Sequence, residues 1–229
     1  MLAKERQFLG ALHNLFVWYT WTLCPSTWST NLTFLHYFYA YVYILHSQRH
    51  HLWRLGWRQP LKQDRASIFA SKGYITLAAD VYGVDNHQPQ EFQEKMALPT
   101  QYRSDLDLAV ARVEAAVELL KSMPSVDSSK LALIGYCFGG SLVLSYSALG
   151  HDSAIATVAF HVSLSAVPNA TELVPIVPKV LILSGGEDSQ DSTKSVMDIE
   201  ASLNAGNATW QLTRYAHVEH AFTNFYSEN

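Results

Sequence analysis

The sequence predicts an α/β protein whose mostly parallel central sheet is covered by helices on both faces. Short apolar runs alternate with longer stretches of helical periodicity from about residue 64 onward. The runs are continuously apolar, which is typical of strands buried on both faces. In such sheets the reactive groups lie on loops at the carboxyl ends of the strands, so a functional site is expected there.

The first elements of this pattern surround a polar insertion. Residues 64–71 are expected to be the end of a helix that Gly73 closes, and residues 74–79 form a buried strand rich in β-formers. Residues 84–102 are polar and contain two prolines, which predicts a loop or a short helix.

A long amphipathic helix is expected next. Ser104 can cap it, with Asp107 three residues on, and Pro124 marks its end. One apolar stripe at three-to-four spacing defines its buried face: Leu106, Ala109, Val110, Val113, Val117 and Leu120.

Strands and helices then alternate to the end of the chain. Strands are expected at residues 131–134, 154–160, 179–183 and 209–215. Helices are expected at residues 140–149, which are apolar nearly all round, with Gly150 as the C-cap, and at residues 192–203.

Bulk composition limits the classes of function. The 229 residues include 48% hydrophobic residues, enough for one large domain or one domain plus an appendage. The net charge of −4 gives no reason to expect a nucleic-acid partner. Cys24 and Cys137 are far apart in the sequence, so no disulfide framework is expected and the reducing cytoplasm is the simpler compartment.

Residues 1–61 differ from the domain expected at residues 62–229. They hold five of the six tryptophans and a single acid, Glu5. Lys4 and Arg6 resemble the basic start of a signal peptide, but neither apolar stretch reaches the length of a membrane-spanning helix. Three interpretations stay open: a signal or membrane contact through residues 8–45, an ordered part of the fold, or a segment that packs poorly. The missing acids and absent periodicity favour the last.

The stretch GYCFGG at residues 135–140 places a cysteine between glycines where a strand meets a helix. This is the small-x-nucleophile-x-small pattern of the hydrolase elbow, with Cys137 in the serine position. The turn strains the central residue, the helix start favours its thiolate, and the N–H of Phe138 is a candidate oxyanion-hole donor. A dinucleotide-binding loop would need glycine at position 137, and a buried structural cysteine is the alternative.

A thiolate nucleophile needs a base, and the base needs an orienting acid. In hydrolases of this kind the chain order is nucleophile, acid, histidine. The strand after the elbow region is followed by Asp188, with Glu187 and Asp191 as competing acids. The last strand is followed by two candidate bases, His217 and His220.

These motifs resemble those of the dienelactone hydrolase family, the carboxymethylenebutenolidase-like cysteine members of the α/β-hydrolase fold. The similar stretches are GYITLAADVYG at residues 73–83, GYCFGG at 135–140, GGED at 185–188 and HAFT at 220–223. The resemblance implies hydrolysis of small esters or lactones without a cofactor or metal, and it favours His220 over His217.

The resemblance also implies a role for each residue. Cys137 would attack the carbonyl, His220 would shuttle the proton, and Asp188 would hold His220 in the right tautomer. Phe138 would serve the oxyanion hole, and Tyr82 would lie near a substrate carboxylate. The expected partner is a small molecule, and no oligomeric state is predicted.

Two departures from the family pattern predict an α/β-hydrolase fold that is incomplete at its N-terminal strands and its C-terminal helix: the sequence before the GYIT strand differs, and the chain stops at Asn229 where the family continues into a closing helix. Family members carry a loop with His-Glu and a glycine before the GYIT strand, whereas residues 51–57 contain no acid. Leu55 or Gly56 is the candidate for the second oxyanion-hole N–H. The alternative function is a catalytically impaired hydrolase-fold protein, acting as a binding module or arising as a defective product.

Overall fold

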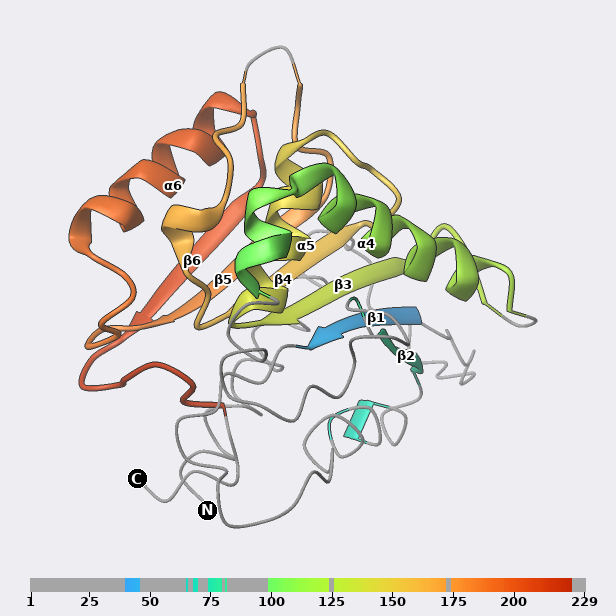
Figure 1. The fold of residues 1–229 in the computed structure, drawn as a ribbon, viewed down its shortest axis with the longest axis horizontal. Helices are drawn as coiled ribbons and strands as arrows, with labels where there is room; N and C mark the ends of the chain where they lie inside the picture. The colour runs from blue at the N-terminus through green and yellow to red at the C-terminus, as the bar shows by residue number, and fades with distance from the viewer. Residues whose placement is uncertain are drawn as a thin grey trace, which may run out of the picture.

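The computed structural model describes residues 65, 68–69, 74–79, 81, 99–123, 126–171 and 174–223, together with the backbone of residues 40–45. Six parallel strands form one sheet in the order β2-β1-β3-β4-β5-β6 (Figure 1). The strands are β1 Ala40–Leu45, β2 Ile75–Ala79, β3 Leu131–Tyr136, β4 Ala156–Phe160, β5 Lys179–Gly185 and β6 Trp210–Tyr215. The helices are α4 Leu106–Lys121, α5 Phe138–Ala148, α6 Thr193–Ala205 and the short 3-10 helix η1 Leu164–Ala166.

Side chains of the central strands alternate between the two faces of the sheet and build a core on each. Helices α4, α5 and α6 lie on one side (Figure 1), where they pack on Leu131, Leu133, Val180 and Ile182. On the other face, Phe69 from a helical segment packs with Ile134 and Tyr136. The predicted α/β-hydrolase fold, with a parallel sheet and helices on both faces, is confirmed.

Strand β1 is a finding that the sequence analysis does not predict. It lies between β2 and β3, so the sheet takes a strand from the segment before residue 62. Its sequence AYVYIL lies inside a longer aromatic run that has no turn residues next to the strand, so the sequence does not show where the strand begins or ends. The other residues of 1–61, and both ends where the fold was expected to be incomplete, lie outside the described residues.

Two predicted helix starts need correction. The N-cap of α4 is Asp105, whose side chain accepts from the N–H of Leu108, rather than Ser104. The hydroxyl of Ser104 instead donates to the carbonyl of Gln101, in the helical segment that precedes α4. Helix α5 begins at Phe138, two residues before the predicted start at residue 140, because the elbow makes Cys137 its N-cap residue.

The register of the sheet gathers the loops of the candidate site at one edge. Tyr136 pairs with Phe160, and Gly185 pairs with Tyr215, so β3 to β6 end at a common level. The residues that follow these ends therefore come together although they are far apart in the sequence.

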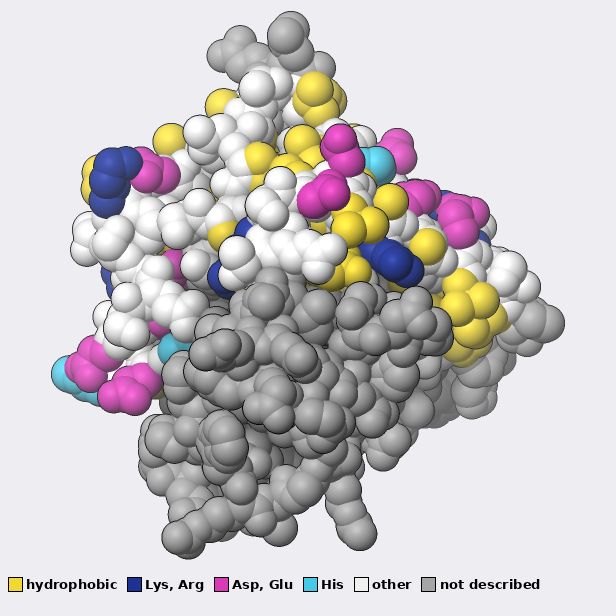
Figure 2. All heavy atoms as spheres, in the orientation of Figure 1, with side chains coloured by type: hydrophobic (Ala, Val, Ile, Leu, Met, Phe, Trp, Pro, Cys, Tyr) yellow, Lys and Arg dark blue, Asp and Glu magenta, His cyan; other side chains and the backbone are white. Residues whose placement is uncertain are grey.

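In the part of the chain that the structure describes, no helix combines the length and apolar character needed to cross a bilayer. The space-filling view shows hydrophobic side chains interspersed with charged ones over α4 (Figure 2).

Candidate active site

Cys137 occupies a strained elbow between β3 and α5. Its backbone angles are φ 53° and ψ −121°, a conformation that residues other than glycine rarely adopt. A Cβ atom at Gly135 would lie 2.2 Å from the carbonyl oxygen of Gly139, so the turn requires glycine there. The N–H of Cys137 donates to the carbonyl of Phe160 at 3.0 Å, which ties the elbow to the end of β4. The predicted tight turn is thus present, and Phe138 supplies the first N–H of the helix.

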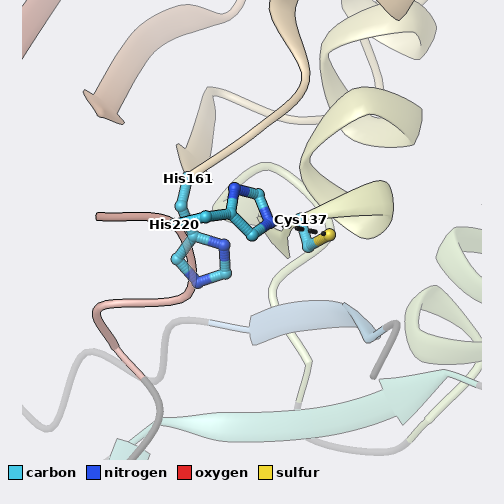
Figure 3. Close-up of side chains that lie close together, drawn as sticks. All are labelled: Cys137, His161 and His220. Atoms are coloured by element: carbon cyan, nitrogen blue, oxygen red, sulfur yellow. Dashed lines mark hydrogen bonds between the residues drawn. The ribbon is translucent and has the colours of Figure 1, made fainter. Parts of the chain in front are cut away.

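The sulfur of Cys137 is within hydrogen-bond range of a histidine. His220 Nε2 lies 3.3 Å from Cys137 Sγ, as the dashed line in Figure 3 marks. The Cys137 residue is only 3% exposed, but its sulfur faces an imidazole rather than packed hydrocarbon alone. The contact joins two loops that are 83 residues apart in the sequence.

The other nitrogen of His220 contacts a buried carboxylate. His220 Nδ1 donates to Asp188 Oδ2 at 2.7 Å, and Asp188 Oδ1 accepts from the N–H of Gln190 at 2.9 Å. Burial alone lowers the pKa of His220, but the hydrogen bonds to Asp188 and Cys137 outweigh it and raise the pKa to about 9. The arrangement therefore stabilises a protonated imidazole between a sulfur and a carboxylate.

Glycines bring the loops after β5 and β6 into direct contact. A Cβ at Gly185 would lie 2.3 Å from the carbonyl oxygen of Val218, which excludes larger residues. The N–H groups of Gly186 and Glu187 donate to the carbonyls of Tyr215 and Val218, at 2.7 Å and 3.0 Å. These bonds fix one loop on the other, and so place the acid of the first opposite the histidine of the second.

The competing acids and base lie elsewhere. Glu187 and His217 contact each other at 2.8 Å, with 56% and 89% of their side chains exposed. Asp191 is buried and accepts from the N–H of Leu164 at 3.0 Å, and burial raises the pKa of its carboxyl. Of the candidates from the sequence, the structure brings Cys137 and Asp188 to His220, whereas Glu187, Asp191 and His217 form hydrogen bonds with other groups in the described part of the chain.

His161 is a site residue that the sequence analysis missed. It follows the last residue of β4, is 4% exposed, and its ring meets that of His220 edge-on at 5.0 Å between centroids. Burial, assisted by the positive charges of His220 and Arg65, holds the pKa of His161 well below its usual value, so the ring is neutral. Its position directly after a buried strand is the signal that could have found it.

Arg65 and Thr223 connect His161 to the loop of His220. His161 Nε2 shares a hydrogen bond with Thr223 Oγ1 at 2.9 Å. The guanidinium of Arg65 donates to both the hydroxyl and the carbonyl of Thr223, each at 2.7 Å, and lies over the ring of Tyr136. The sulfur of Cys137 and one nitrogen each of His161 and His220 lie within 4.8 Å of one another, so among the described residues these three form a group that could hold a metal.

A small pocket lies beside the elbow. Its volume is about 200 Å³, and it is lined by Tyr102, Arg103, Phe138 and Ser141, with Leu106, Leu142, Ser145 and residues 165–168 completing the wall. Phe138 joins the pocket to Cys137 because the two residues are adjacent in the chain. The lining of the pocket includes neither Cys137 nor His220, so this pocket lies next to the candidate site without containing the reacting groups.

The remaining sequence candidates lie outside the described residues. They are Tyr82 and the two candidates for the second oxyanion-hole donor, Leu55 and Gly56. Strand β1 nevertheless ends beside the elbow, because Leu45 pairs with Tyr136.

Comparison with known proteins places the chain in one family of hydrolases. The sequence profile of the dienelactone hydrolase family matches residues 55–229. A putative carboxymethylenebutenolidase of Methylorubrum extorquens is 28% identical over 178 residues, which cover 70% of this chain and 57% of that protein. Protein usf of Aquifex pyrophilus is 24% identical over 180 residues, or 76% of this chain and 74% of that one.

The same fold is found among solved structures. The crystal structure of a dienelactone hydrolase-like promiscuous phosphotriesterase from metagenomic libraries superposes with a TM-score of 0.68 at 24% identity, covering 81% of this chain and 73% of that one. The chain therefore belongs to the dienelactone hydrolase family, and it is a hydrolase acting on carboxylic ester bonds, as the sequence predicts.

Proposed function

We propose that the chain hydrolyses small esters or lactones through a catalytic triad of Cys137, His220 and Asp188. The observation that carries this proposal is the continuous chain of contacts from Cys137 Sγ through both nitrogens of His220 to Asp188 Oδ2, at 3.3 Å and 2.7 Å. Nucleophile, base and orienting acid are thereby in the order that acyl transfer requires.

The first half of the reaction forms a thioester. His220 Nε2 takes the proton of the Cys137 thiol, and the sulfur attacks the carbonyl carbon of the substrate. The carbonyl oxygen becomes an oxyanion, which the N–H of Phe138 stabilises. His220 then gives its proton to the leaving alkoxide oxygen as the C–O bond breaks, and the acyl group stays on the sulfur.

The second half releases the acid. A water molecule loses a proton to His220 Nε2 and attacks the thioester carbon, and the C–S bond breaks as the sulfur regains a proton. Asp188 holds the imidazole in one orientation and offsets its positive charge in both halves. For a lactone, the alcohol and the acyl group belong to one molecule, so the product is a single hydroxy acid.

The family resemblance supports small substrates and a carboxylate on the substrate that Tyr82 contacts. Replacement of Tyr82 by phenylalanine should then raise KM for carboxylate-bearing substrates more than for uncharged ones. Equal changes in KM for the two classes would remove Tyr82 from the proposal.

The decisive test compares the purified parent protein with Cys137→Ala on p-nitrophenyl acetate and on a dienelactone. Cys24→Ala is the matched control, because it removes the other cysteine of the chain. The parent and the control should turn over substrate and give an acylated peptide containing Cys137 on mass spectrometry. Equal rates for the parent and Cys137→Ala would reject the cysteine mechanism.

A further inference from the structure

One buried group at the site has no role in the proposed hydrolysis. His161 reaches the site from the end of β4, whereas Cys137 follows β3 and His220 lies in the loop after β6. Figure 3 shows both imidazole rings beside the cysteine. The three potential ligand atoms lie within 4.8 Å of one another.

The two nitrogens of His161 have different surroundings. Nε2 is hydrogen-bonded to Thr223, whereas Nδ1 is buried without a hydrogen-bond partner among the described residues. A buried polar atom without a partner costs about 1–3 kcal/mol, so such atoms call for an explanation. Because Nε2 is already hydrogen-bonded to Thr223, Nδ1 is the nitrogen of His161 that a ligand at the site can use.

We propose that Cys137, His161 and His220 together bind a thiophilic divalent cation such as Zn²⁺. One thiolate and two imidazoles are a ligand set that suits zinc, and three protein ligands leave the fourth tetrahedral position open. Zn–S and Zn–N bonds of about 2.3 Å and about 2.0 Å place sulfur and nitrogen about 3.5 Å apart. Cys137 Sγ and His220 Nε2 already lie 3.3 Å apart, and the spacings to the third ligand are at most 4.8 Å. Small side-chain rotations therefore close the site.

Both histidines already have the hydrogen bonds that orient metal ligands. His220 donates from Nδ1 to the carboxylate of Asp188, which is the outer contact typical of zinc-bound histidine. His161 is held through Nε2 by Thr223, which Arg65 fixes in turn. In each case the nitrogen that would bind the cation is the one that faces the sulfur or lacks a partner.

Binding has a defined chemical balance and consequence. The cation replaces the single proton that Cys137 and His220 share, and this proton leaves to solvent. A sulfur bound to zinc no longer attacks a carbonyl carbon, so the cation acts as a reversible inhibitor rather than a cofactor. The binding itself does not depend on the proposed hydrolysis and is measured without substrate.

Spectroscopy with Co²⁺ tests the site in the full-length chain. A Cys24→Ser background leaves Cys137 as the one thiol of the chain, so any thiolate signal reports binding at Cys137. One equivalent of Co²⁺ should give a thiolate-to-cobalt charge-transfer band, which one equivalent of Zn²⁺ removes. Cys137→Ser should abolish the band. Its absence in the background protein would overturn the proposal.

Competition with a chromogenic zinc indicator then tests the third ligand. Loss of an outer contact weakens metal binding by 10–100-fold, so His161→Gln, which removes a ligand, should weaken it by about 100-fold or more. His217→Gln, at an exposed histidine paired with Glu187, should bind as the background does. Equal affinity of His161→Gln and the background would overturn the proposal.

Alkylation of Cys137 tests the proposal without any substitution at the three ligands, so it remains informative if the ligand variants fail to fold. Zn²⁺ should protect Cys137 of the Cys24→Ser protein from alkylation by iodoacetamide, and a chelator should restore the reaction. Alkylation at an unchanged rate with saturating Zn²⁺ would overturn the proposal, whatever the variants do. Slow ester hydrolysis with intact protection would instead reject only the proposed function.

Discussion

Replacement of Asp188 by asparagine is the sharpest test of how the site works. The substitution keeps the size of the side chain but removes the negative charge that contacts His220 Nδ1 at 2.7 Å. The pKa of His220 is raised from 6.5 to about 9, with the hydrogen bond to Asp188 the largest of the raising effects. Because each pKa unit corresponds to 1.36 kcal/mol, this net rise, to which Cys137 also contributes and which burial opposes, is worth about 3 kcal/mol for the protonated ring, and it sets the order of magnitude for the loss of Asp188.

The size of the kinetic effect follows from that figure. About 3 kcal/mol in the transition state is a factor of roughly 100–300 in kcat/KM. Loss of the correct tautomer adds to it, and the same change in serine hydrolases costs about 10⁴. The expected fall for Asp188→Asn therefore lies between about 10² and 10⁴.

Steady-state hydrolysis of p-nitrophenyl acetate measures this fall, and two matched variants control for it. Asp191→Asn alters a buried carboxyl three residues along the same loop, and Glu187→Gln alters the exposed neighbour. Both should keep kcat/KM within about threefold of the parent, since neither acid contacts His220 by a hydrogen bond in the described part of the chain. Activity of Asp188→Asn within a factor of ten of the parent, with a large loss in either control, would refute the assignment of the acid.

Three further predictions concern stability, each measured by urea unfolding. Gly135→Ala should lower the free energy of unfolding by about 2–3 kcal/mol, because its Cβ would lie 2.2 Å from the carbonyl oxygen of Gly139; a loss under about 0.5 kcal/mol would contradict the elbow geometry. Leu133→Ala, at a fully buried position of β3, should cost about 2–5 kcal/mol, whereas Leu119→Ala on the exposed side of α4 should cost under about 1 kcal/mol. Burial is the main cause that raises the pKa of Asp191. The contribution of the Asp191 carboxyl to the free energy of unfolding is therefore fully present below pH 3.8, its ordinary pKa, and is lost as the pH rises through its higher pKa in the folded state. Asp191→Asn should therefore gain stability relative to the parent as pH rises from about 4 to about 7, and a constant difference would show that the carboxyl pKa is not raised.

The elements that sequence reasoning predicted are those with a complete local signal. Strand β3 and helix α5 have continuous apolar runs on either side of a glycine-flanked turn, so the elbow was readable from residues 131–149 alone. The N-cap of α4 was misplaced by one residue because Ser104 and Asp105 are both good caps. The choice was decided by the helical segment before α4, which occupies Ser104.

The choice between neighbouring acids and histidines could not be made from local pattern. Glu187 and Asp188 follow the same strand, and His217 and His220 follow another. Two backbone hydrogen bonds between the loops decide which side chains turn inward, and neither bond is readable from the sequence. Only the resemblance of residues 220–223 to the family motif favours His220 over His217 in the sequence.

His161 could have been predicted as a site residue, because reactive groups in parallel sheets lie on the loops at the carboxyl ends of strands. The rule that identified Cys137 and His220 applies equally to the residue that follows β4, yet a search for nucleophile, acid and base has no place for a second histidine. Whether that side chain turns inward depends on its backbone, and His161 has φ 38°, in the left-handed region that a sequence does not reveal. A strained angle at Cys137 serves the proposed nucleophile. The proposed cation site gives the strained angle at His161 a comparable role, because a cation there would use the buried ring nitrogen that has no partner among the described residues.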